Sequence, residues 1–425
     1  MRILFLTHYF PPEVNAPASR TYEHCQRWVR DGHEVTVITC APNCPTGVVF
    51  DGYRNAWRTE ETIDGIRVIR VWSYVAANKG FAKRIINFLS YMLTATWAAM
   101  WCRKVDVVVA TSPQFFCGWA GVCSKWLLRR PLVLEIRDLW PESILAVGAM
   151  KRNFAIRILE WFEQRMYGAA NRIVTVGEGY RRQLEERNVP SGKIEVIPNG
   201  VDLDRVAEQM AAAADNPLER PENRFVCSYI GTVGMAHGLE VVVEAAKKLR
   251  DACRDDVEFW IVGDGAERER LQAEVKQLGL STVFFHGMVP KEMVPRVIEA
   301  SDACLVHLRK TDLFTTVMPS KIFEIMAQNV PIVMGVEGEA QRVVLDGKGG
   351  VAMEPGDADS LLSAMDEIRR KPASVQRGRD YVAQHYNRER LAGRMLSVLH
   401  EVAGLPVPRP VEERVPAAAE ERRAA

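Results

Sequence analysis

The stretch MPSKIFEIMAQNVPIV, residues 318–333, shows the structural unit from which most of this chain is built. A Pro-Ser-Lys loop leads into an apolar helix that carries one acid, Glu324, and that we expect to end at Asn329. A buried strand that begins at Pro331 follows at once. A helix that alternates with a buried strand is typical of a parallel sheet, because parallel strands need a crossover connection.

The start of this helix is a candidate anion site. Ser320 and Lys321 stand where the first amide N–H groups are unpaired and the helix dipole is positive, which favours a phosphate group. Glu324 follows about one turn later, where its carboxylate is placed to accept hydrogen bonds from sugar hydroxyls. The same residues are equally typical of a capped surface helix whose lysine makes a salt bridge, so the rest of the chain has to decide.

The first half of the chain alternates short apolar runs with helical stretches. The runs are β-branched and nearly continuous, as in a parallel sheet covered on both faces, and predict strands at Ile3–Thr7, Glu34–Thr39, Arg67–Val71, Val105–Ala110, Leu132–Ile136, Arg172–Val176 and Glu195–Ile197. Helices are expected between them, for example at Ser19–Asp31 and Ile156–Tyr167. This is the doubly wound α/β pattern.

The pattern restarts in the second half. Strands are expected at Phe225–Ile230, Val257–Val262, Val283–His286, Ala303–His307, Pro331–Met334 and Gly350–Met353, with helices between them. We therefore predict an α/β fold of two Rossmann-like, doubly wound domains that face a cleft, at residues 1–200 and 201–380. One further helix at Tyr381–Val402, within residues 381–404, and a disordered tail at 405–425 complete the expected organisation.

Composition and cysteine usage narrow the class of protein. A chain of 425 residues with 48% hydrophobic and 26% charged residues is ordinary for a globular protein and too long for a single core. The nine cysteines never form a CxxC pair, and the closest two, Cys40 and Cys44, have no histidine at zinc-ligand spacing. We expect a reducing cytosol. The run Met1–Leu6 is too short for a signal peptide and predicts a first buried strand.

Charge is divided unevenly along the chain. Residues 1–200 hold 26 Lys and Arg against 18 Asp and Glu, and residues 201–425 hold 29 against 36. A basic first half indicates a partner such as anionic lipid or phosphate, although chance asymmetry also explains the numbers. We expect no nucleic-acid partner.

One long uncharged segment, Ile85–Cys102, lies between basic residues. Its 18 residues would just cross a bilayer core, but crossing would place strands of one sheet on both sides of a membrane. Three polar residues fall on one face of the helix, opposite Phe88, Leu89, Met92 and Trp101: they are Asn87, Ser90 and Thr94. We predict an interfacial helix at the inner-membrane surface, with a buried core helix as the alternative.

Loops after the strands of the second half supply further candidate binding residues. Backbone amides at such positions can approach a phosphate, and a nucleobase can stack after the third strand. The candidates are Gly231, Thr232, Gly234, Gly263, Gly265 and Met288. Each signal is weak alone, because glycine after a strand is common and Asp264 is equally suited to capping a helix.

Taken in order, the motifs make the chain resemble a known family. They are GHEVTVIT (32–39), EIRDLWPES (135–143), VIPNGVD (196–202), YIGTVGMAHGLE (229–240), IVGDGAERERL (261–271), FFHGMVP (284–290), MPSKIFEIMA (318–327) and GGVAMEPGD (349–357). Over nearly all of residues 1–400 the chain resembles the family-4 glycosyltransferases of GT-B fold. It is most similar to the branch of surface-polysaccharide transferases that includes fucosamine transferases.

The resemblance implies an activity and a location. It implies a retaining, metal-independent enzyme that moves a hexosyl or N-acetylhexosaminyl group from a nucleotide-diphosphate sugar, with UDP favoured, to a lipid-linked or saccharide acceptor. The process would be lipopolysaccharide or exopolysaccharide biosynthesis, without a cofactor, in a cytoplasmic enzyme peripheral to the inner membrane. A sugar-nucleotide 2-epimerase of the same fold and a non-catalytic polysaccharide-assembly protein are the alternatives.

The resemblance also carries over donor-binding residues, with departures. Glu324 matches the second acid of the family's E-x7-E motif, but the first acid would fall at Thr316. The family's Arg and Lys pair on the donor diphosphate would fall at Thr232 and His237, and the histidine contributes charge only if it is protonated. We therefore expect the positive charge to come from Lys321, from the helix start at Ser320 and from Arg309.

In the first half, the resemblance indicates acceptor-binding residues. The family's cleft histidine would fall at Arg137, whose planar guanidinium can hydrogen-bond a sugar or a phosphate. Asp138 beside it is either an acceptor-orienting base or an ion-pair partner of Arg137. Asn15 and the next residue would supply a close backbone approach to the donor. Arg20 on the following helix either faces the cleft or is solvated.

Overall fold

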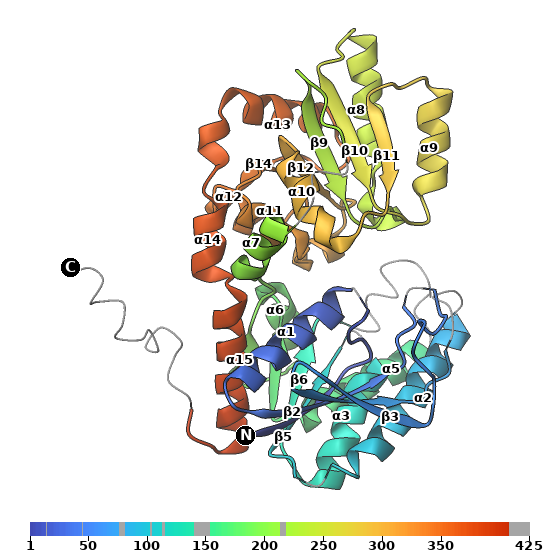
Figure 1. Cartoon of the computed structure of the whole chain (residues 1–425). Helices are drawn as coiled ribbons and strands as arrows, with labels where there is room; N and C mark the ends of the chain where they lie inside the picture. The colour runs from blue at the N-terminus through green and yellow to red at the C-terminus, as the bar shows by residue number, and fades with distance from the viewer. Residues whose placement is uncertain are drawn as a thin grey trace, which may run out of the picture. The chain divides into compact units, whose positions relative to one another are not determined.

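The computed structural model describes residues 1–13, 15–44, 46–75, 81–102, 104–112, 115–139, 154–212 and 218–407. They form two compact units (Figure 1). Unit 1 contains Met1–Pro198 and the segment that begins at Arg388, and unit 2 is Asn199–Asn387. The predicted boundary at residue 200 thus lies two residues from the division in the structure. The predicted tail lies outside the described residues from 408 onward.

Unit 1 is built on an eight-stranded sheet in the order β3-β4-β2-β1-β5-β6-β7-β8. Every pairing is parallel except that of β3 with β4 at the edge of the sheet. The strands are β1 Arg2–Leu6, β2 Glu34–Cys40, β3 Arg58–Ile63, β4 Ile66–Val71, β5 Val107–Thr111, β6 Leu132–Ile136, β7 Arg172–Thr175 and β8 Ile194–Val196. The predicted strands of this half are all present, and β3 is an addition.

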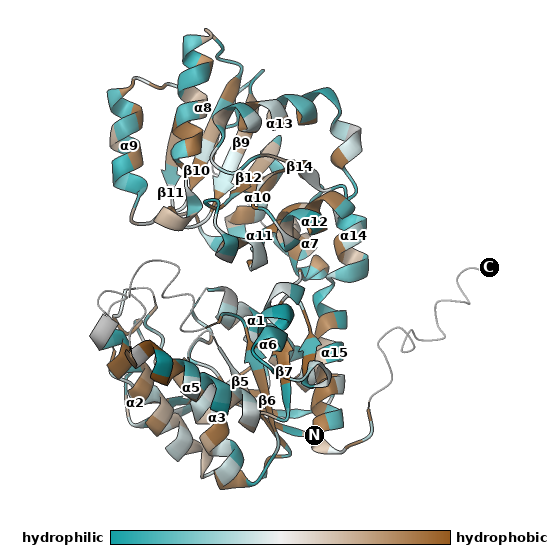
Figure 2. Cartoon of the chain, turned by 180° about the vertical axis from the view of Figure 1, so that it is seen from behind, coloured by the Kyte–Doolittle hydropathy of each residue, from teal (hydrophilic) through white to brown (hydrophobic). Residues whose placement is uncertain are grey.

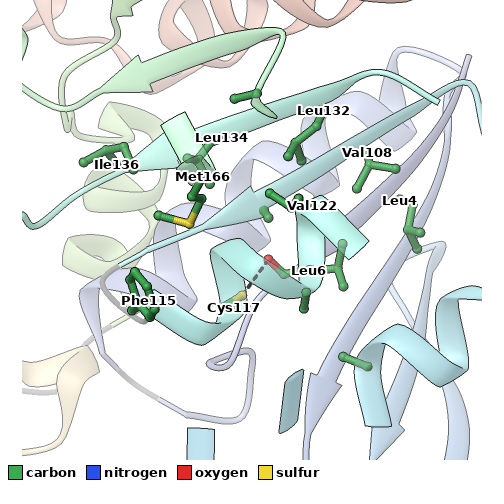
Figure 3. Packing of buried hydrophobic residues seen from close by; sticks show 14 of the residues in the cluster. Leu4, Leu6, Val108, Phe115, Cys117, Val122, Leu132, Leu134, Ile136 and Met166 are labelled. Carbon is green, nitrogen blue, oxygen red and sulfur yellow. Dashed lines mark hydrogen bonds between the residues drawn. The ribbon is translucent and has the colours of Figure 1, made fainter. Parts of the chain in front are cut away.

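Alternating side chains of these strands build a core on each face of the sheet. Leu4 and Leu6 lie in the core beneath α2, α3, α5 and α6, whereas Ile3 and Phe5 lie in the core beneath α1 and α15. Figure 3 shows the first core, where the Cys117 thiol also donates to the Leu6 carbonyl at 3.4 Å. The helices are α1 Ala16–Arg30, α2 Phe81–Ala99, α3 Phe115–Leu128, α5 Phe154–Ala169, α6 Glu178–Glu186 and α15 Arg388–Ala403.

Unit 2 has a six-stranded sheet in the order β11-β10-β9-β12-β13-β14, and all of its pairings are parallel. The strands are β9 Phe225–Ile230, β10 Val257–Val262, β11 Val283–Gly287, β12 Ala303–His307, β13 Ile332–Gly335 and β14 Gly350–Ala352. The α-helices are α7 Leu203–Ala212, α8 Glu240–Asp251, α9 Arg268–Gln277, α10 Val294–Glu299, α11 Lys321–Ala327, α12 Glu339–Asp346, α13 Ala358–Arg370 and α14 Gly378–His385. Helices α8, α9 and α13 share one core, and α11 and α12 share the other.

The helix predicted at Tyr381–Val402 is wrong in one respect, because it is two helices. Helix α14 ends at His385 and belongs to unit 2, while α15 begins at Arg388 and belongs to unit 1. Leu391, Met395 and Leu399 of α15 are buried against the sheet of unit 1. The indole N–H of Trp28 in α1 donates to the Ala392 carbonyl at 3.0 Å, which fixes α15 to α1.

All nine cysteines are free thiols. In the part of the chain that the structure describes, no helix is both long and apolar enough to cross a membrane. The predicted helix Ile85–Cys102 is α2, which begins earlier, at Phe81, and ends at Ala99. The side of α2 that faces the sheet buries the polar Asn87 and Thr94 together with the apolar Tyr91 and Ala95.

Candidate active site

Ligands of open parallel sheets bind beyond the carboxyl ends of the strands, where the strand order reverses. In unit 2 this reversal falls between β9 and β12, which are paired neighbours. Gly231 follows β9, and Arg309 comes two residues after the end of β12. Helix α11, which carries Lys321 and Glu324, follows the β12 loop. The sequence-predicted donor residues therefore gather at the point where this fold binds ligands.

The glycines of the β9 and β10 loops are required by backbone packing. A Cβ on Gly263 would lie 1.9 Å from the Gly231 carbonyl oxygen, and one on Gly265 would lie 2.3 Å from that of Val233. The Val233 N–H donates to the Asp264 carbonyl at 2.9 Å, which joins the two loops. Gly263 and Gly265 thus position the 231–234 loop, and their expected direct approach to a phosphate stays a prediction.

Lys321 places its ammonium against the carboxyl end of β9. Its Nζ lies 4.3 Å above the centroid of the Tyr229 ring, and a Cβ on Gly231 would come within 2.7 Å of it. Burial lowers the pKa of Lys321 to about 8, and nearby Glu324 offsets only part of that effect. Among the described residues, no carboxylate or carbonyl oxygen accepts a hydrogen bond from this ammonium. Such a group is placed to receive an anion.

The carboxylate of Glu324 is also available. Within the described residues, this side chain has neither a hydrogen bond nor an ion pair. Burial raises the pKa of Glu324, and the positive charges of Lys291, Lys321 and Arg205 oppose that rise. A half-buried acceptor surrounded by cations suits the hydroxyl groups of a ribose or a sugar. The alternative of a capped surface helix with a salt-bridged lysine is wrong for α11, because Ser320 makes no side-chain cap either.

His237 does not supply the missing positive charge. Burial and, to a smaller extent, the charge of Lys321 lower its pKa to about 4, so the imidazole is neutral near pH 7. His307 at the end of β12 holds the same loop, because its Nδ1 lies 2.6 Å from the His237 carbonyl oxygen. Its Nε2 accepts from the Gly356 N–H at 2.9 Å. This network fixes a neutral His307 with the proton on Nδ1.

Arg309 has partners other than the predicted diphosphate. Its Nε donates to the Met235 carbonyl at 2.6 Å and its Nη2 to Glu240 Oε1 at 2.6 Å. Glu240 therefore compensates much of its charge, and Arg309 mainly closes the loop that carries His237. The contacts of Arg309 do not support the predicted role.

Met288 and Thr232 lie on the surface of unit 2. Met288 follows β11 and is 78% exposed, and Thr232 is also exposed. The Tyr229 hydroxyl donates to the Thr232 carbonyl at 2.7 Å, so this loop has an internal anchor. The rings of Phe284 and His286 in β11 stack with centroids 6.4 Å apart. Base stacking in this region stays a prediction.

In unit 1, a buried ion pair lies beside the predicted acceptor residues. Arg20 donates from Nε to Glu135 Oε1 at 2.8 Å, and both side chains are almost fully buried. Arg20 also donates to the carbonyls of Ile197 and Pro198 at the end of unit 1. Burial would raise the pKa of Glu135, but Arg20 and Arg137 hold it at about 2. These contacts give Arg20 a structural role in place of the solvated or cleft-facing position that we expected.

Arg137 and Asp138 follow β6 directly. The Arg137 N–H donates to the Ser112 hydroxyl at 3.4 Å, and the Ser112 hydroxyl donates to the Asp138 carbonyl at 3.2 Å. Burial lowers the pKa of Arg137 to about 10, which leaves it charged at neutral pH. Both side chains are half-buried at the carboxyl edge of the sheet, and their contact with an acceptor stays a prediction. The rest of their motif, from Trp140, lies outside the described residues.

Asn15 has a capping role. Its side-chain oxygen accepts from the Ala18 N–H at 2.9 Å, so it is the N-cap of α1. This is compatible with the expected backbone approach and does not test it. No group of three or more His, Cys, Asp or Glu in the described ranges is arranged to hold a metal ion. A metal carried mainly by a diphosphate needs no such group, so metal independence remains a proposal.

Sequence reasoning missed three residues of these sites. Glu135 is an acid within the buried strand LVLEI, Tyr229 is the only large polar-tipped residue of β9, and His307 ends the apolar strand ACLVH. The available signal was a polar group near the carboxyl end of an otherwise apolar parallel strand, because such a group must find a partner.

Two family models match the chain, one for each half. Residues 15–200 match the glycosyl transferase 4-like domain, and residues 211–387 match the glycosyl transferases group 1. The first match ends two residues after Pro198, the second lies within unit 2, and α15 lies outside both.

Individual relatives cover most of the chain. It is 26% identical over 400 residues to WcaI of Escherichia coli (strain K12), a glycosyl transferase provisionally named for colanic acid biosynthesis, with 92% of this chain and 97% of that protein covered. It is 23% identical over 365 residues to a GDP-mannose-dependent alpha-mannosyltransferase of Mycobacterium tuberculosis, with 85% and 86% covered. The solved structure of Anabaena Alr3699/HepE with UDP and glucose matches with a TM-score of 0.64 at 16% identity, covering 94% of this chain and 99% of that one.

The family models describe transferases, so the epimerase and the non-catalytic alternative have no support from them. Two parallel-sheet Rossmann-like units and the matched family models agree. The chain is a glycosyltransferase and belongs to the family-4 glycosyltransferases of GT-B fold.

Proposed function

We propose that this glycosyltransferase moves a sugar from a nucleotide-diphosphate sugar to a lipid-linked or saccharide acceptor, with retention of anomeric configuration and without a metal ion. The observation that carries the proposal is a pair of opposite charges on α11 that make no hydrogen bond or ion pair within the described residues. The ammonium of Lys321 and the carboxylate of Glu324 lie three residues apart on one helix at the strand-order reversal of unit 2.

The donor is proposed to bind unit 2. Its diphosphate would lie beside Lys321 and the backbone of Gly231, and its ribose or sugar hydroxyls would donate to Glu324. A desolvated ammonium is strongly attracted to an anion, because little water screens the interaction. We favour UDP as the nucleotide of the donor, as expected from the resemblance, and the HepE structure with UDP and glucose supports this choice. The mannosyltransferase relative is named for GDP-mannose, so both bases have to be tested.

The chemical step is proposed as follows. The bond between the anomeric carbon and the phosphate oxygen breaks, and its electron pair stays on the leaving diphosphate. The acceptor hydroxyl oxygen bonds to the anomeric carbon on the same face, and its proton passes to the leaving phosphate oxygen. The Lys321 ammonium would stabilise the charge that grows on that oxygen, in the manner of an oxyanion site.

The acceptor is proposed to bind unit 1 through Arg137 and Asp138. The relative named for colanic acid biosynthesis supports a role in surface-polysaccharide assembly. Since such glycans are commonly built on lipid carriers, we propose a cytoplasmic enzyme that works at the inner-membrane surface. The basic balance of residues 1–200 and the exposed leucines of α2 support this location.

A thermal-shift titration with UDP and GDP, each with MgCl₂ or with EDTA, tests the donor site first. A ligand that binds only the native state stabilises it by RT ln(1 + [L]/Kd), so the base that binds is identified by its shift. We expect a shift with UDP that survives EDTA and that Glu324→Gln reduces. A transfer assay with radiolabelled UDP-sugars and a membrane extract as acceptor follows. Absence of any shift and of any transfer would contradict the proposal, and a shift only with Mg²⁺ would overturn metal independence.

A further inference from the structure

Helix α2 is apolar on two sides, because Tyr91, Ala95 and Ala98 lie in the core of unit 1 and its outer side is apolar too. Asn87 and Thr94 are buried, and the Thr94 hydroxyl donates to the Trp72 carbonyl at 2.8 Å. The outer side carries Ile86, Leu89 and Leu93, and Leu93 is 60% exposed. A surface helix of a globular protein normally carries charged or polar residues on the side that faces away from the core. Brown, hydrophobic ribbon accordingly marks much of α2 in Figure 2.

The neighbouring helices α3 and α5 continue this outward apolar surface. Helix α3 packs against both α2 and α5. Near its end Trp126 and Leu127 are exposed, and on α5 Trp161 and Phe162 are exposed. We call the outward surface of α2, α3 and α5 the apolar face.

Aromatic residues are concentrated on the apolar face. On the α2 side, the Trp97 ring lies 5.4 Å from that of Trp57 and 6.2 Å from that of Trp101. On the other side, Phe162 joins Trp119 at 5.7 Å and Trp161 at 4.9 Å. Tryptophan favours the boundary between water and lipid, because its large ring is apolar and its N–H is polar.

The other helices of the chain do not share this property. Within the described residues, α1, α6 and α15 of unit 1 carry no exposed large apolar side chain, and the α-helices of unit 2 carry one, Leu345. The apolar face spans three helices that are about 8–10 Å apart and more than 20 Å long, so it is on the order of 500 Å². A patch of that size on a protein surface marks an interaction site.

The charges around the apolar face identify its partner. The sequences of α2 and α3 contain no acid, and Lys83 and Arg84 begin α2 on its exposed side. On α5 the Arg165 guanidinium lies over Trp161, 4.8 Å from the ring centroid. Of the two acids of α5, Glu163 is buried and pairs with Arg187 at 2.7 Å, and Glu160 is half-buried, whereas Arg157 and Arg165 of this helix are exposed. An apolar surface with a basic border is complementary to an anionic bilayer.

From the apolar outer side of α2, the aromatic concentration and this charge, we propose that α2, α3 and α5 together form a docking face that rests on an anionic lipid bilayer. This inference rests on the proposed membrane-surface function and extends it from one helix to three. The aromatic residues enter the headgroup region, and the basic residues contact the lipid phosphates. The surface is broad enough to hold the protein in one orientation, which a single helix does not do.

A vesicle-binding assay on the full chain tests the proposal. The lipids are phosphatidylcholine alone and phosphatidylcholine with phosphatidylglycerol, at low and high salt. The variants are Leu93→Glu in α2 and Trp161→Glu in α5, with Leu345→Glu in unit 2 as the matched control. All three positions are exposed, so each variant is expected to fold. We expect binding only to the anionic vesicles, weakened by salt, and a loss of about tenfold or more in each of the first two variants but not in the control.

The outcomes separate the proposal from the function on which it rests. If Leu93→Glu loses binding and Trp161→Glu does not, α2 alone contacts lipid and the three-helix face is wrong. If the wild type binds no vesicle but transfers sugar to a soluble acceptor, the membrane proposal fails and the glycosyl-transfer proposal stands. If the wild type is a dimer that Trp161→Glu dissociates, with no vesicle binding, the apolar face is an interface between two copies.

Discussion

Replacing Lys321 by methionine tests the central chemical claim, that this ammonium stabilises the leaving diphosphate. Methionine is similar in length to lysine and replaces the ammonium over the Tyr229 ring by an apolar group, so the fold should be preserved. Lys310→Met is the matched control, because Lys310 is exposed and pairs with Glu337 at 3.1 Å in the same unit.

The expected loss follows from the position of the charge. Two unit charges about 4 Å apart interact by about 4 kcal/mol at an effective dielectric constant of about 20. The diphosphate is already charged when the donor binds, so only part of this energy is specific to the transition state. If about half of this interaction energy develops only in the transition state, Lys321→Met raises the barrier of the chemical step by about 2 kcal/mol and lowers kcat ~30-fold. The whole interaction energy is lost from kcat/KM, which falls by ~10³-fold.

The pH dependence gives a second, independent readout. Burial lowers the pKa of Lys321 to about 8, so the free enzyme loses the ammonium as the pH rises through that value. About nine-tenths of the side chains are charged at pH 7 and about one-tenth at pH 9. Because kcat/KM reports ionisation of the free enzyme, it should fall about tenfold per pH unit above 8. Lys321→Arg keeps its charge in this range and should lack the decline.

Initial rates of sugar transfer, measured from pH 6 to 10 at saturating and at low donor, distinguish these effects. The reasoning would be refuted if Lys321→Met retained kcat/KM within about twofold of Lys310→Met, since the two variants remove the same charge from the same unit. It would also be refuted if the alkaline decline persisted in Lys321→Arg, because another group would then be titrating.

Three further changes test the sites separately. Glu324→Gln should lower kcat/KM by about 10- to 100-fold. Burial raises the pKa of Glu324, so ionisation of this carboxyl lowers the stability of the folded protein as the pH rises. The melting temperature of Glu324→Gln at about pH 7.5 should therefore equal or exceed that of the wild type. Glu135→Gln should destabilise the protein by about 3–5 kcal/mol in urea unfolding, because it leaves the Arg20 charge buried without its partner. The stability that Glu135 contributes is present above its unfolded pKa of about 4.3 and lost as the pH falls toward about 2, so the two proteins should converge in acid. Gly263→Ala should destabilise unit 2 by about 2–4 kcal/mol and abolish the nucleotide-induced thermal shift, whereas Gly168→Ala, where a Cβ meets no atom within 4 Å, should do neither.

The regular part of the fold was predictable because its elements are governed by periodicity. Buried parallel strands give continuous apolar runs, and the restart of this pattern identified the second unit. Strand β3 was not predicted, because RTEETI is an edge strand with few apolar residues. The turn residues Asp64 and Gly65, both at positive φ, gave the available hairpin signal. The break between α14 and α15 was not predicted either, because no glycine or proline marks it.

The site was only partly predictable, and the misses have one physical cause. The position of Lys321 and Glu324 follows from helix geometry, which the sequence supplies. The partners of a long cationic side chain depend on residues distant in sequence. Arg309 therefore closes a loop through Glu240, and Arg20 pairs with Glu135 across 115 residues. The neutral state of His237 likewise depends on burial, which no local pattern reveals.

The position of Lys321 offers a reason why unit 2 lacks the family's cations at Thr232 and His237. A positive charge on the β9 loop would lie close to Lys321, whose Nζ already occupies the space beside Gly231. Like charges at that distance would lower the pKa of both groups and weaken each of them. Helix α11 is rigidly placed, because Ile322, Phe323 and Ile325 are buried in the core. We therefore propose that the Lys321 ammonium on this fixed helix binds the diphosphate in place of the two loop cations, and that it loses its proton near pH 8.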